Sequence, residues 1–330
     1  LLYPGSTGLL YNVAVVGNRS DSGGGFGGGG GIAVMENGLL VMKNSTVANN
    51  QSHLGGGIYA DQGAVEISHV TVAQNTAGQD GGGIYNFGTL EFFNTLIADN
   101  QAAGQGPDLR QEAMATLLPP QGVNLLSDLS GSTLTAGSSV LEADPLFAGL
   151  GVYGNKHTIL PLRPGSPAID ALPFTFFIPL DDYVLDQRGA PRDGTKDIGA
   201  VEFVSTVVTT EIDEDNVNPG TGRSLREALN NPYSTTITFD VPLAGKTNTA
   251  VHGSLNIDRA MEIDASSLSD LFVLSGASTW RVMTVASNAG PVRLDSLGFT
   301  FGVATGDTVI ASSGGALYSE GDVSIHRSRF

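Results

Sequence analysis

Three oxygen-bearing side chains in the most acidic stretch of the sequence could bind a calcium ion. Asp213 and Asp215 are separated by one residue, Asn216 follows them, and the turn residues Pro219 and Gly220 come next. Carboxylate and amide oxygens are the ligands that Ca²⁺ takes from proteins. The glutamate that completes an EF-hand loop is missing at its required spacing, so a solvated linker is the alternative interpretation.

Carboxylates further upstream could instead act as the acid and base of a hydrolase. Asp170, Asp186 and Asp197 are interspersed with Arg188 and Arg192 in a stretch rich in proline and glycine. Glycoside hydrolases use two carboxylates that flank the scissile bond. These acids, however, fall among turn residues, and the arginines carry the opposite charge. We therefore expect ion pairs within a compact cap over the exposed edge of the preceding strands.

The remaining acidic and imidazole side chains show no catalytic pattern. An enzyme built on stacked strands needs two or three carboxylates on neighbouring repeats, or a metal cluster. Asp61, Asp80 and Asp99 do not share a position within the repeat of this chain. His53 and His69 also differ in position and lack an evident partner. No cofactor motif stands out, so calcium is the only ligand of this kind that the sequence suggests.

A sequence repeat positions most of these side chains. A glycine-rich motif occurs at 29–32, 55–59 and 81–85, with the same interval from each copy to the next. Each copy ends on an asparagine, and these asparagines are also evenly spaced: Asn50, Asn75 and Asn100. A fixed period of about 25 residues indicates a solenoid or another repeat architecture.

The repeat predicts an all-β fold, a parallel β-helix with about 25 residues per coil. No copy contains a run of helix length with apolar residues at helical spacing, which excludes the helical repeats. A propeller blade needs roughly 40 residues. Glycine at one corner of each coil supplies a positive φ or room for tight backbone packing. The recurring Ile and Val side chains are expected to point inward.

Two kinds of recurring polar side chain each allow two interpretations. Asn50, Asn75 and Asn100 either form a ladder of side-chain hydrogen bonds between successive coils or occupy surface turns, and their fixed spacing favours the ladder. Tyr59 and Tyr85 either stack on a sugar or pack over the edge of the coils, and packing is the favoured interpretation. None of these roles is catalytic.

Composition limits the classes of partner. The 330 residues include 45 glycines and no cysteine, and the formal net charge is −17 at pH 7. Such an acidic chain is not expected to bind nucleic acid or an anionic membrane through a basic surface. No apolar run approaches the length that a helix needs to cross a bilayer, so no membrane span is expected.

Four motifs occur in order between residues 144 and 202. They are Asp-Pro-Leu-Phe at 144–147, Leu-Pro-Leu-Arg-Pro-Gly-Ser-Pro-Ala-Ile-Asp at 160–170, Asp-Gln-Arg-Gly-Ala-Pro-Arg at 186–192 and Asp-Ile-Gly-Ala-Val-Glu at 197–202. Together they resemble the choice-of-anchor Q domain, which ends the β-helix of many bacterial surface proteins. The resemblance implies the terminus of a right-handed β-helix in an exported protein, and no active site.

A short helix is predicted at 222–229, where Ser224 and Glu227 form a capping box. The same residues resemble the CSLREAI motif that begins bacterial β-helix regions, with Arg223 where that family has its cysteine. Short alternating strands follow, and Gly-Gly-Ala-Leu-Tyr at 314–318 repeats the motif of 55–59. We expect the helix to cover the open end of a second stack of coils.

The order of these parts predicts four segments, with a turn-rich junction between two β-helices. They are closing coils at 1–142, the Q-like terminal region at 143–203, an acidic linker and capping helix at 204–232, and opening coils at 233–330. The chain is then either a fragment of a tandem protein or a subunit that stacks end to end into a filament.

Function follows from the same order of parts. The sequence predicts a non-catalytic structural or adhesive protein of a bacterial cell surface or extracellular matrix. Its expected partners are neighbouring units of the same protein, a glycan or a cell surface. A carbohydrate-active enzyme, either a polysaccharide lyase or a glycoside hydrolase, is the alternative.

Overall fold

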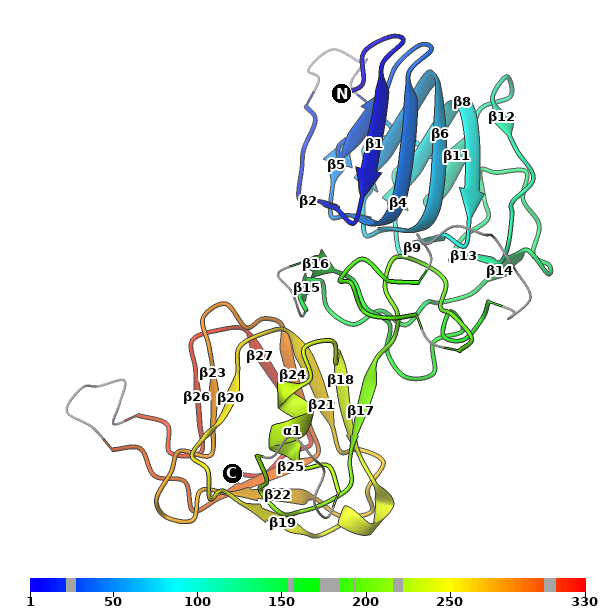
Figure 1. The fold of residues 1–330 in the computed structure, drawn as a ribbon. Coiled ribbons are helices and arrows are strands. Elements are labelled where there is room, and N and C mark those ends of the chain that lie inside the picture. The colour runs from blue at the N-terminus through cyan, green and yellow to red at the C-terminus, as the bar shows by residue number, and fades with distance from the viewer. Residues whose placement is uncertain (22–27, 154–156, 173–183, 193, 216–221, 306–312) are drawn as a thin grey trace. The chain divides into compact units, whose positions relative to one another are not determined.

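The structure is a computed structural model that describes residues 1–21, 28–153, 157–172, 184–192, 194–215, 222–305 and 313–330. The chain forms two compact units (Figure 1). Unit 1 comprises Leu1–Ala148 and His157–Glu202, and unit 2 comprises Gly149–Lys156 and Phe203–Phe330. No helix among the described residues is long and apolar enough to span a membrane.

Unit 1 consists of strands and connecting turns in its described part. Its strands are β1 (Thr7–Tyr11), β2 (Ala14–Val16), β3 (Ile32–Val34), β4 (Leu39–Ala48), β5 (Gln51–Ser52), β6 (Ile58–Ala73), β7 (Thr76–Ala77), β8 (Ile84–Phe93), β9 (Leu96–Ala98), β10 (Gln101–Ala102), β11 (Leu109–Gln111), β12 (Thr116–Leu117), β13 (Asn124–Leu126), β14 (Val140–Glu142) and β16 (Thr158–Ile159). The all-β prediction is confirmed for this unit.

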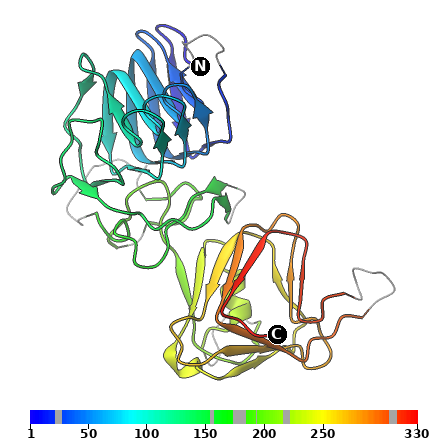
Figure 2. The same ribbon diagram turned by 180° about the vertical axis from the view of Figure 1, so that it is seen from behind.

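Successive repeats of unit 1 pair in parallel and in register. Ile32 of β3 pairs with Ile58 of β6, Ile58 pairs with Ile84 of β8, and Ile84 pairs with Leu109 of β11. β4, β6 and β8 therefore lie side by side in both ribbon views (Figure 1 and Figure 2). The shared register follows from the fixed spacing of the motif, because a slip of one residue would turn every apolar side chain outward.

The inner face of these strands forms the core of unit 1. Leu40, Val65 and Leu90 occupy paired positions on β4, β6 and β8, and at most 1 % of each residue is exposed. Full burial of one such side chain stabilises the fold by about 1.5–3 kcal/mol. The alternation of buried and less buried residues in the first half of β4 leaves every second side chain there on the outer face.

The pairing continues past Asn100, where the motif is no longer visible in the sequence. β11 and β12 both pair with β8, β13 pairs with β9, and β14 pairs with β13. Apolar residues of β13 are fully buried. The stack of paired strands therefore continues beyond the last clear copy of the sequence repeat.

Residues 186–192 and 194–200 lie along one side of the repeats, which corrects the expectation of a cap over the last strands. Their hydrogen bonds reach four successive repeats: Gln187 Nε2 donates to Val13 O (3.0 Å), Arg192 Nη2 to Asn44 Oδ1 (3.3 Å), Ala200 N to Thr71 Oγ1 (3.0 Å) and Gly199 N to Asn94 O (2.9 Å). Each repeat turns at this side, and its backbone carbonyl and side-chain oxygens there accept these hydrogen bonds. Because buried polar groups need hydrogen-bond partners, these residues bind along the repeats.

Unit 2 also consists mainly of short strands. They are β15 (Gly151–Val152), β17 (Ser205–Val208), β18 (Thr236–Phe239), β19 (Thr247–Thr249), β20 (Leu255–Ile257), β21 (Met261–Asp264), β22 (Phe272–Ser275), β23 (Met283–Val285), β24 (Val292–Asp295), β25 (Leu297–Thr300), β26 (Leu317–Ser319) and β27 (Val323–His326), with the helix α1 (Leu225–Asn230) and the 3-10 helix η2 (Val241–Leu243). Within the described residues, all of these strands except β15 form three parallel sheets, in the orders β17-β18-β21-β24-β27, β19-β22-β25 and β20-β23-β26.

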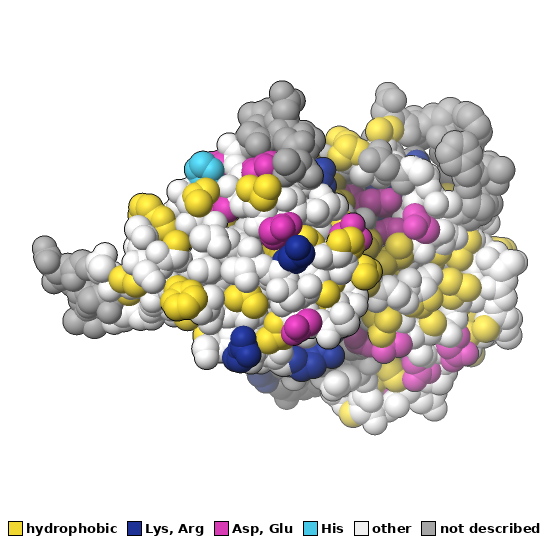
Figure 3. Space-filling view, turned by 90° about the horizontal axis from the view of Figure 1, so that it is seen from below, with side chains coloured by type: hydrophobic (Ala, Val, Ile, Leu, Met, Phe, Trp, Pro, Cys, Tyr) yellow, Lys and Arg dark blue, Asp and Glu magenta, His cyan; other side chains and the backbone are white. Residues whose placement is uncertain are grey.

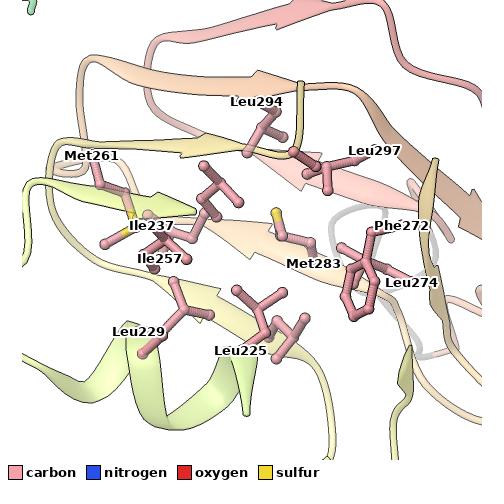
Figure 4. Packing of buried hydrophobic residues seen from close by; sticks show 14 of the residues in the cluster. Leu225, Leu229, Ile237, Ile257, Met261, Phe272, Leu274, Met283, Leu294 and Leu297 are labelled. Carbon is pink, nitrogen blue, oxygen red and sulfur yellow. The ribbon is translucent and has the colours of Figure 1, made fainter. Parts of the chain in front are cut away.

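Helix α1 covers one end of the core of unit 2. Ser224 and Glu227 form the capping box, in which the Ser224 side chain accepts from the Glu227 N–H and the Glu227 side chain accepts from the Ser224 N–H. Leu225 and Leu229 point from the helix towards Ile257 and the rest of the buried cluster (Figure 4). Since the apolar face of the helix faces this cluster, it shields the first strands from water.

Candidate functional site

An unbroken row of hydrogen bonds joins the asparagines of the repeat. Asn18 Nδ2 donates to Asn50 Oδ1 (2.9 Å), Asn50 Nδ2 to Asn75 Oδ1 (3.0 Å), Asn75 Nδ2 to Asn100 Oδ1 (3.0 Å), and Asn100 Nδ2 to Asp108 Oδ1 (2.9 Å). We call Asn18, Asn50, Asn75, Asn100 and Asp108 the amide ladder. The last four of these residues are buried.

The asparagines inside the ladder also bind the backbone. The Oδ1 of Asn75 accepts the Asn50 N–H (2.9 Å), and the Nδ2 of Asn75 donates to Val47 O (3.0 Å). Asn100 makes the equivalent bonds to the Asn75 N–H and to Val72 O, both at 3.0 Å. A side-chain amide has two donors and one acceptor oxygen. Because the ladder occupies both Nδ2 donors and the Oδ1 acceptor of Asn75 and Asn100, these side chains have no hydrogen-bonding group left to bind a substrate.

The three glycines of each motif serve three different purposes at the corner beside the ladder. In the second copy, Gly55 has a φ of +59°, a conformation that side chains rarely adopt. A Cβ on Gly56 would lie 2.5 Å from the carbonyl oxygen of Gly82, and a Cβ on Gly57 would lie 3.0 Å from Asn75 Nδ2. The glycines therefore allow close stacking and leave room for the ladder amide.

Asp108 ends the ladder. It occupies the position of the third glycine in the fourth repeat, since the neighbouring Leu109 pairs with Ile84. One carboxylate oxygen accepts from Asn100, and the other accepts from Ser127 N (2.8 Å) and Ser127 Oγ (2.7 Å). Burial raises the pKa of Asp108 to about 6, against the opposing effect of these hydrogen bonds. A carboxylate suits this position because it only accepts hydrogen bonds.

His69 belongs to a second row of polar residues, together with Asn44 and Asn94. All three have a positive φ, and their spacing is one repeat. The Nδ2 of Asn94 lies 3.1 Å from His69 Nε2, and Ser68 Oγ lies 3.1 Å from His69 Nδ1. Burial, followed by the charge of Arg192, holds the pKa of His69 well below its usual range. The expectation that His69 lacks a partner was wrong, whereas His53 lies outside this row.

The carboxylates proposed as a hydrolase pair lie in a buried ionic network. Asp186 accepts from Arg188 Nη2 at 2.7 Å, and Glu202 accepts from Arg192 Nη1 at 3.1 Å. The Asp186 and Arg188 side chains are fully buried. Burial raises the pKa of Glu202 to about 7, with Asp197 adding to the shift and Arg192 opposing it. These ion pairs join residues of the same stretch to one another, and Arg192 Nη2 also contacts the repeats by donating to Asn44 Oδ1.

Asp170 joins the same network through its backbone. Its N–H donates to Asp197 Oδ1 at 2.8 Å, and Asp197 is buried. Two of the three aspartates of the hydrolase hypothesis, Asp186 and Asp197, are therefore enclosed. A general acid or base must reach the proton that it transfers. The expected ion pairs account for this cluster better than catalysis does.

The candidate calcium ligands are divided between described and undescribed residues. Asp213 accepts from Arg226 Nε (2.8 Å) and from the N–H groups of Val251 (2.8 Å) and His252 (3.1 Å). Asp215 Oδ1 accepts a hydrogen bond from Asn230 Nδ2 at 3.4 Å, and Asn216 lies outside the described residues. Within the described ranges no group of three or more acidic or histidine side chains could hold a metal ion. Calcium binding stays a prediction.

Tyr59 and Tyr85 stack on each other. Their ring centroids are 5.4 Å apart with an interplanar angle of 27°. The outer face of the Tyr59 ring is covered by Gly28, where an added Cβ would fall 2.3 Å from the ring. Tyr85 Oη donates to Glu112 Oε1 at 3.1 Å. The rings therefore pack over the edge of the repeats, and the face of Tyr59 is not open to a sugar.

A groove lies on the outer face of β4, β6 and β8. It has a volume of about 310 Å³ and is lined by Val41, Met42, Lys43, Glu66, Ile67, Ser68, Glu91, Phe93 and Gln121. Glu66 and Glu91 pair directly across β6 and β8. Sequence reasoning missed this pair, although the two glutamates share a position in successive repeats.

Comparison with protein families, with curated proteins and with solved structures found no match for this chain. The resemblance to the choice-of-anchor Q domain and to the CSLREAI motif therefore stays a prediction.

Proposed function

We propose that this chain is a non-catalytic structural or adhesive protein, exported to a bacterial cell surface or extracellular matrix. In this proposal both units are parallel β-helices, right-handed and with about 25 residues per coil. The supporting observation is the amide ladder, which runs from Asn18 to Asp108 through successive repeats. The residues that recur in the sequence serve contacts between repeats, as they do in a scaffold whose coils stack.

The surface of the molecule is compatible with this role. In Figure 3, hydrophobic side chains on the face shown are interspersed with polar and acidic ones. A strongly acidic chain, with a net charge of −17, stays soluble and repels polyanions such as nucleic acids. Its partners in this proposal are glycans, cell surfaces and other copies of the same protein.

Self-association would use the outer edges of the sheets. Among the described strands, β1 pairs with β4 and β2 with β4, and β27 pairs with β24. Each outer strand thus presents hydrogen-bonding groups on one side, and strand addition is a common way to satisfy them. Contacts between unlike ends that do not close into a ring produce a filament.

A carbohydrate-active enzyme is the second candidate, favoured by one observation. Glu66 and Glu91 lie opposite each other on neighbouring strands within the outer groove, and two facing carboxylates are the catalytic requirement of most glycoside hydrolases.

Sedimentation velocity and negative-stain microscopy over a range of protein concentrations test the leading proposal. We expect head-to-tail assemblies whose average length increases with concentration. A discrete monomer at every concentration would contradict self-association. Release of reducing ends from a polysaccharide by the purified chain would contradict the non-catalytic role.

A further inference from the structure

The outer groove of unit 1 holds two carboxylates side by side. Glu66 and Glu91 occupy directly paired positions on β6 and β8, and the residues before and after each of them are buried. Both side chains therefore point away from the core. Adjacent strands are about 4.8 Å apart, so the two negative charges repel each other.

No other side chain of the described residues neutralises this pair through a hydrogen bond or ion pair. Glu66 is exposed and Glu91 is half-buried, and neither carboxylate takes part in such a contact within the described part of the chain. Asp108 and Glu202, whose pKa values are raised, are by contrast enclosed by hydrogen-bond donors. The groove pair thus differs from the structural carboxylates of the same unit.

The rest of the groove supplies donors and apolar surface. Lys43 stands on β4 with its Nζ 5.7 Å from the ring centroid of Tyr11, and Gln121 also lines the groove. Phe93 packs edge-on against His69, with 5.7 Å between ring centroids, and is a further lining residue. Val41 adds apolar surface beside Glu66.

We propose that this groove binds a neutral, hydroxyl-rich saccharide across β4, β6 and β8. Carboxylate oxygens accept hydrogen bonds from sugar hydroxyls, and the Lys43 and Gln121 side chains donate to sugar oxygens. The Phe93 ring and Val41 provide the apolar contact that the C–H face of a sugar ring needs. Two carboxylates against one lysine leave the groove negative, which disfavours an anionic glycan. The proposal rests on the adhesive role proposed above, to which it gives a ligand class and a site.

Isothermal titration calorimetry tests the site with the full chain. The probes are hexasaccharides of cellulose, xylan and mannan, with an oligogalacturonate of the same length as the acidic comparison. We expect at least one neutral hexasaccharide to bind and the oligogalacturonate not to bind. Glu66→Gln combined with Glu91→Gln should weaken binding at least tenfold. Glu36→Gln, at an exposed glutamate of a turn in the same unit, is the matched control and should bind like the parent chain.

Three results would overturn this proposal. They are the absence of binding by every neutral hexasaccharide, preferential binding of the oligogalacturonate, and unchanged binding by the double variant when its circular dichroism spectrum matches that of the parent.

Failure here is distinguishable from failure of the proposed function. If the chain forms filaments but binds no saccharide, the saccharide site in the groove is rejected and the structural role is kept. Binding accompanied by release of reducing ends would support the groove as a saccharide site and contradict the non-catalytic role.

Discussion

At the scale of single residues, the repeat motif is explained by what its side chains do between neighbouring repeats. The ladder asparagine needs a donor and an acceptor on the same short side chain, and the glycine beside it must leave space. Aspartate lacks the donor, so it occurs at the end of the ladder, as Asp108 does. These roles are structural, and their loss should first reduce the stability of unit 1.

Asn75→Ala is expected to destabilise unit 1 by about 3 kcal/mol, because several buried hydrogen bonds are lost together and buried donors are left without partners. The lost bonds join Asn75 to Asn50, to Asn100 and to Val47 O. Urea denaturation monitored by circular dichroism measures the change. Gln51→Ala, at an exposed neighbouring position, is the control and should change stability by less than about 0.5 kcal/mol. Equal losses for both variants would contradict the ladder.

Gly57→Ala should cost about 2 kcal/mol through overpacking. The added Cβ would lie 2.7 Å from the carbonyl oxygen of Gly83 and 3.0 Å from Asn75 Nδ2. Gly78→Ala is the matched control, because the nearest atoms to its Cβ lie 3.7 Å away. That control should leave stability unchanged or raise it by up to about 1 kcal/mol. The same denaturation measurement decides, and a tolerated Gly57→Ala would show that the corner is looser than described.

Residue spacing predicted the ladder but left other polar residues of unit 1 unassigned. His69 is one repeat away from Asn44 and from Asn94, and the Glu66 and Glu91 pair is spaced in the same way, so the period alone could have found them. Asp108 was harder to find because the glycine motif has become Gly-Pro-Asp in that repeat. Neither its hydrogen-bond partners nor its burial follow from spacing, since they depend on how the chain returns at Ser127.

At the scale of elements, residues 186–192 and 194–202 lie along the repeats, and we call them the brace. Sequence reasoning predicted that Arg188 and Arg192 pair with aspartates of this region. Asp186 does pair with Arg188, whereas Arg192 pairs with Glu202, which that prediction did not include. The prediction placed these residues over the last strands of the repeats. The reason was that a sequence repeat implies a final strand with an exposed edge, which a cap would cover. The positive-φ turns of each repeat provide a second set of unpaired polar groups, and these decide where the brace binds.

The brace makes the stability of unit 1 depend on pH. The pKa of Glu202 is raised to about 7 in the folded state, from an ordinary value of 4.5. Between those two values the folded chain retains a proton that the unfolded chain has released, so stability decreases as pH rises. Asp108, with its pKa raised to about 6, acts in the same direction, whereas the lowered pKa of His69 acts in the opposite direction up to its ordinary value of 6.5.

Thermal denaturation at pH 5 and at pH 8 tests this dependence. The midpoint of unit 1 should be lower at pH 8, and Glu202→Gln should reduce the difference because the titrating group is gone. An equal change of the midpoint in the parent chain and in the Glu202→Gln variant would contradict the role assigned to Glu202.

At the scale of the whole molecule, the chain is a pair of units whose strands pair in parallel with the preceding and following repeats. The sequence predicted this class of structure because glycine spacing and apolar alternation are both local patterns. The predicted closing coils extended to residue 142, and β11, β12 and β13 do pair beyond Asn100, through residues that depart from the motif. Inward-facing apolar residues continue there without the full glycine motif.

Disulfide cross-linking tests the central claim most directly, namely that successive repeats stack in parallel at a fixed register. The chain has no cysteine, so introduced pairs report only on their own proximity. Ala64 and Thr89 are directly paired on β6 and β8. Their Cα atoms are expected to be about 4.8 Å apart, within the range that a disulfide bridges.

The double variant Ala64→Cys with Thr89→Cys should form an intramolecular disulfide on mild oxidation, measured by mass spectrometry of the unreduced chain. Ala64→Cys with Phe93→Cys is the matched control, because the greater separation along β8 adds roughly 13 Å. The account predicts a disulfide in the first variant and none in the second. A disulfide only in the second variant, or in neither, would contradict the parallel register on which the stacked-repeat fold and its proposed function depend.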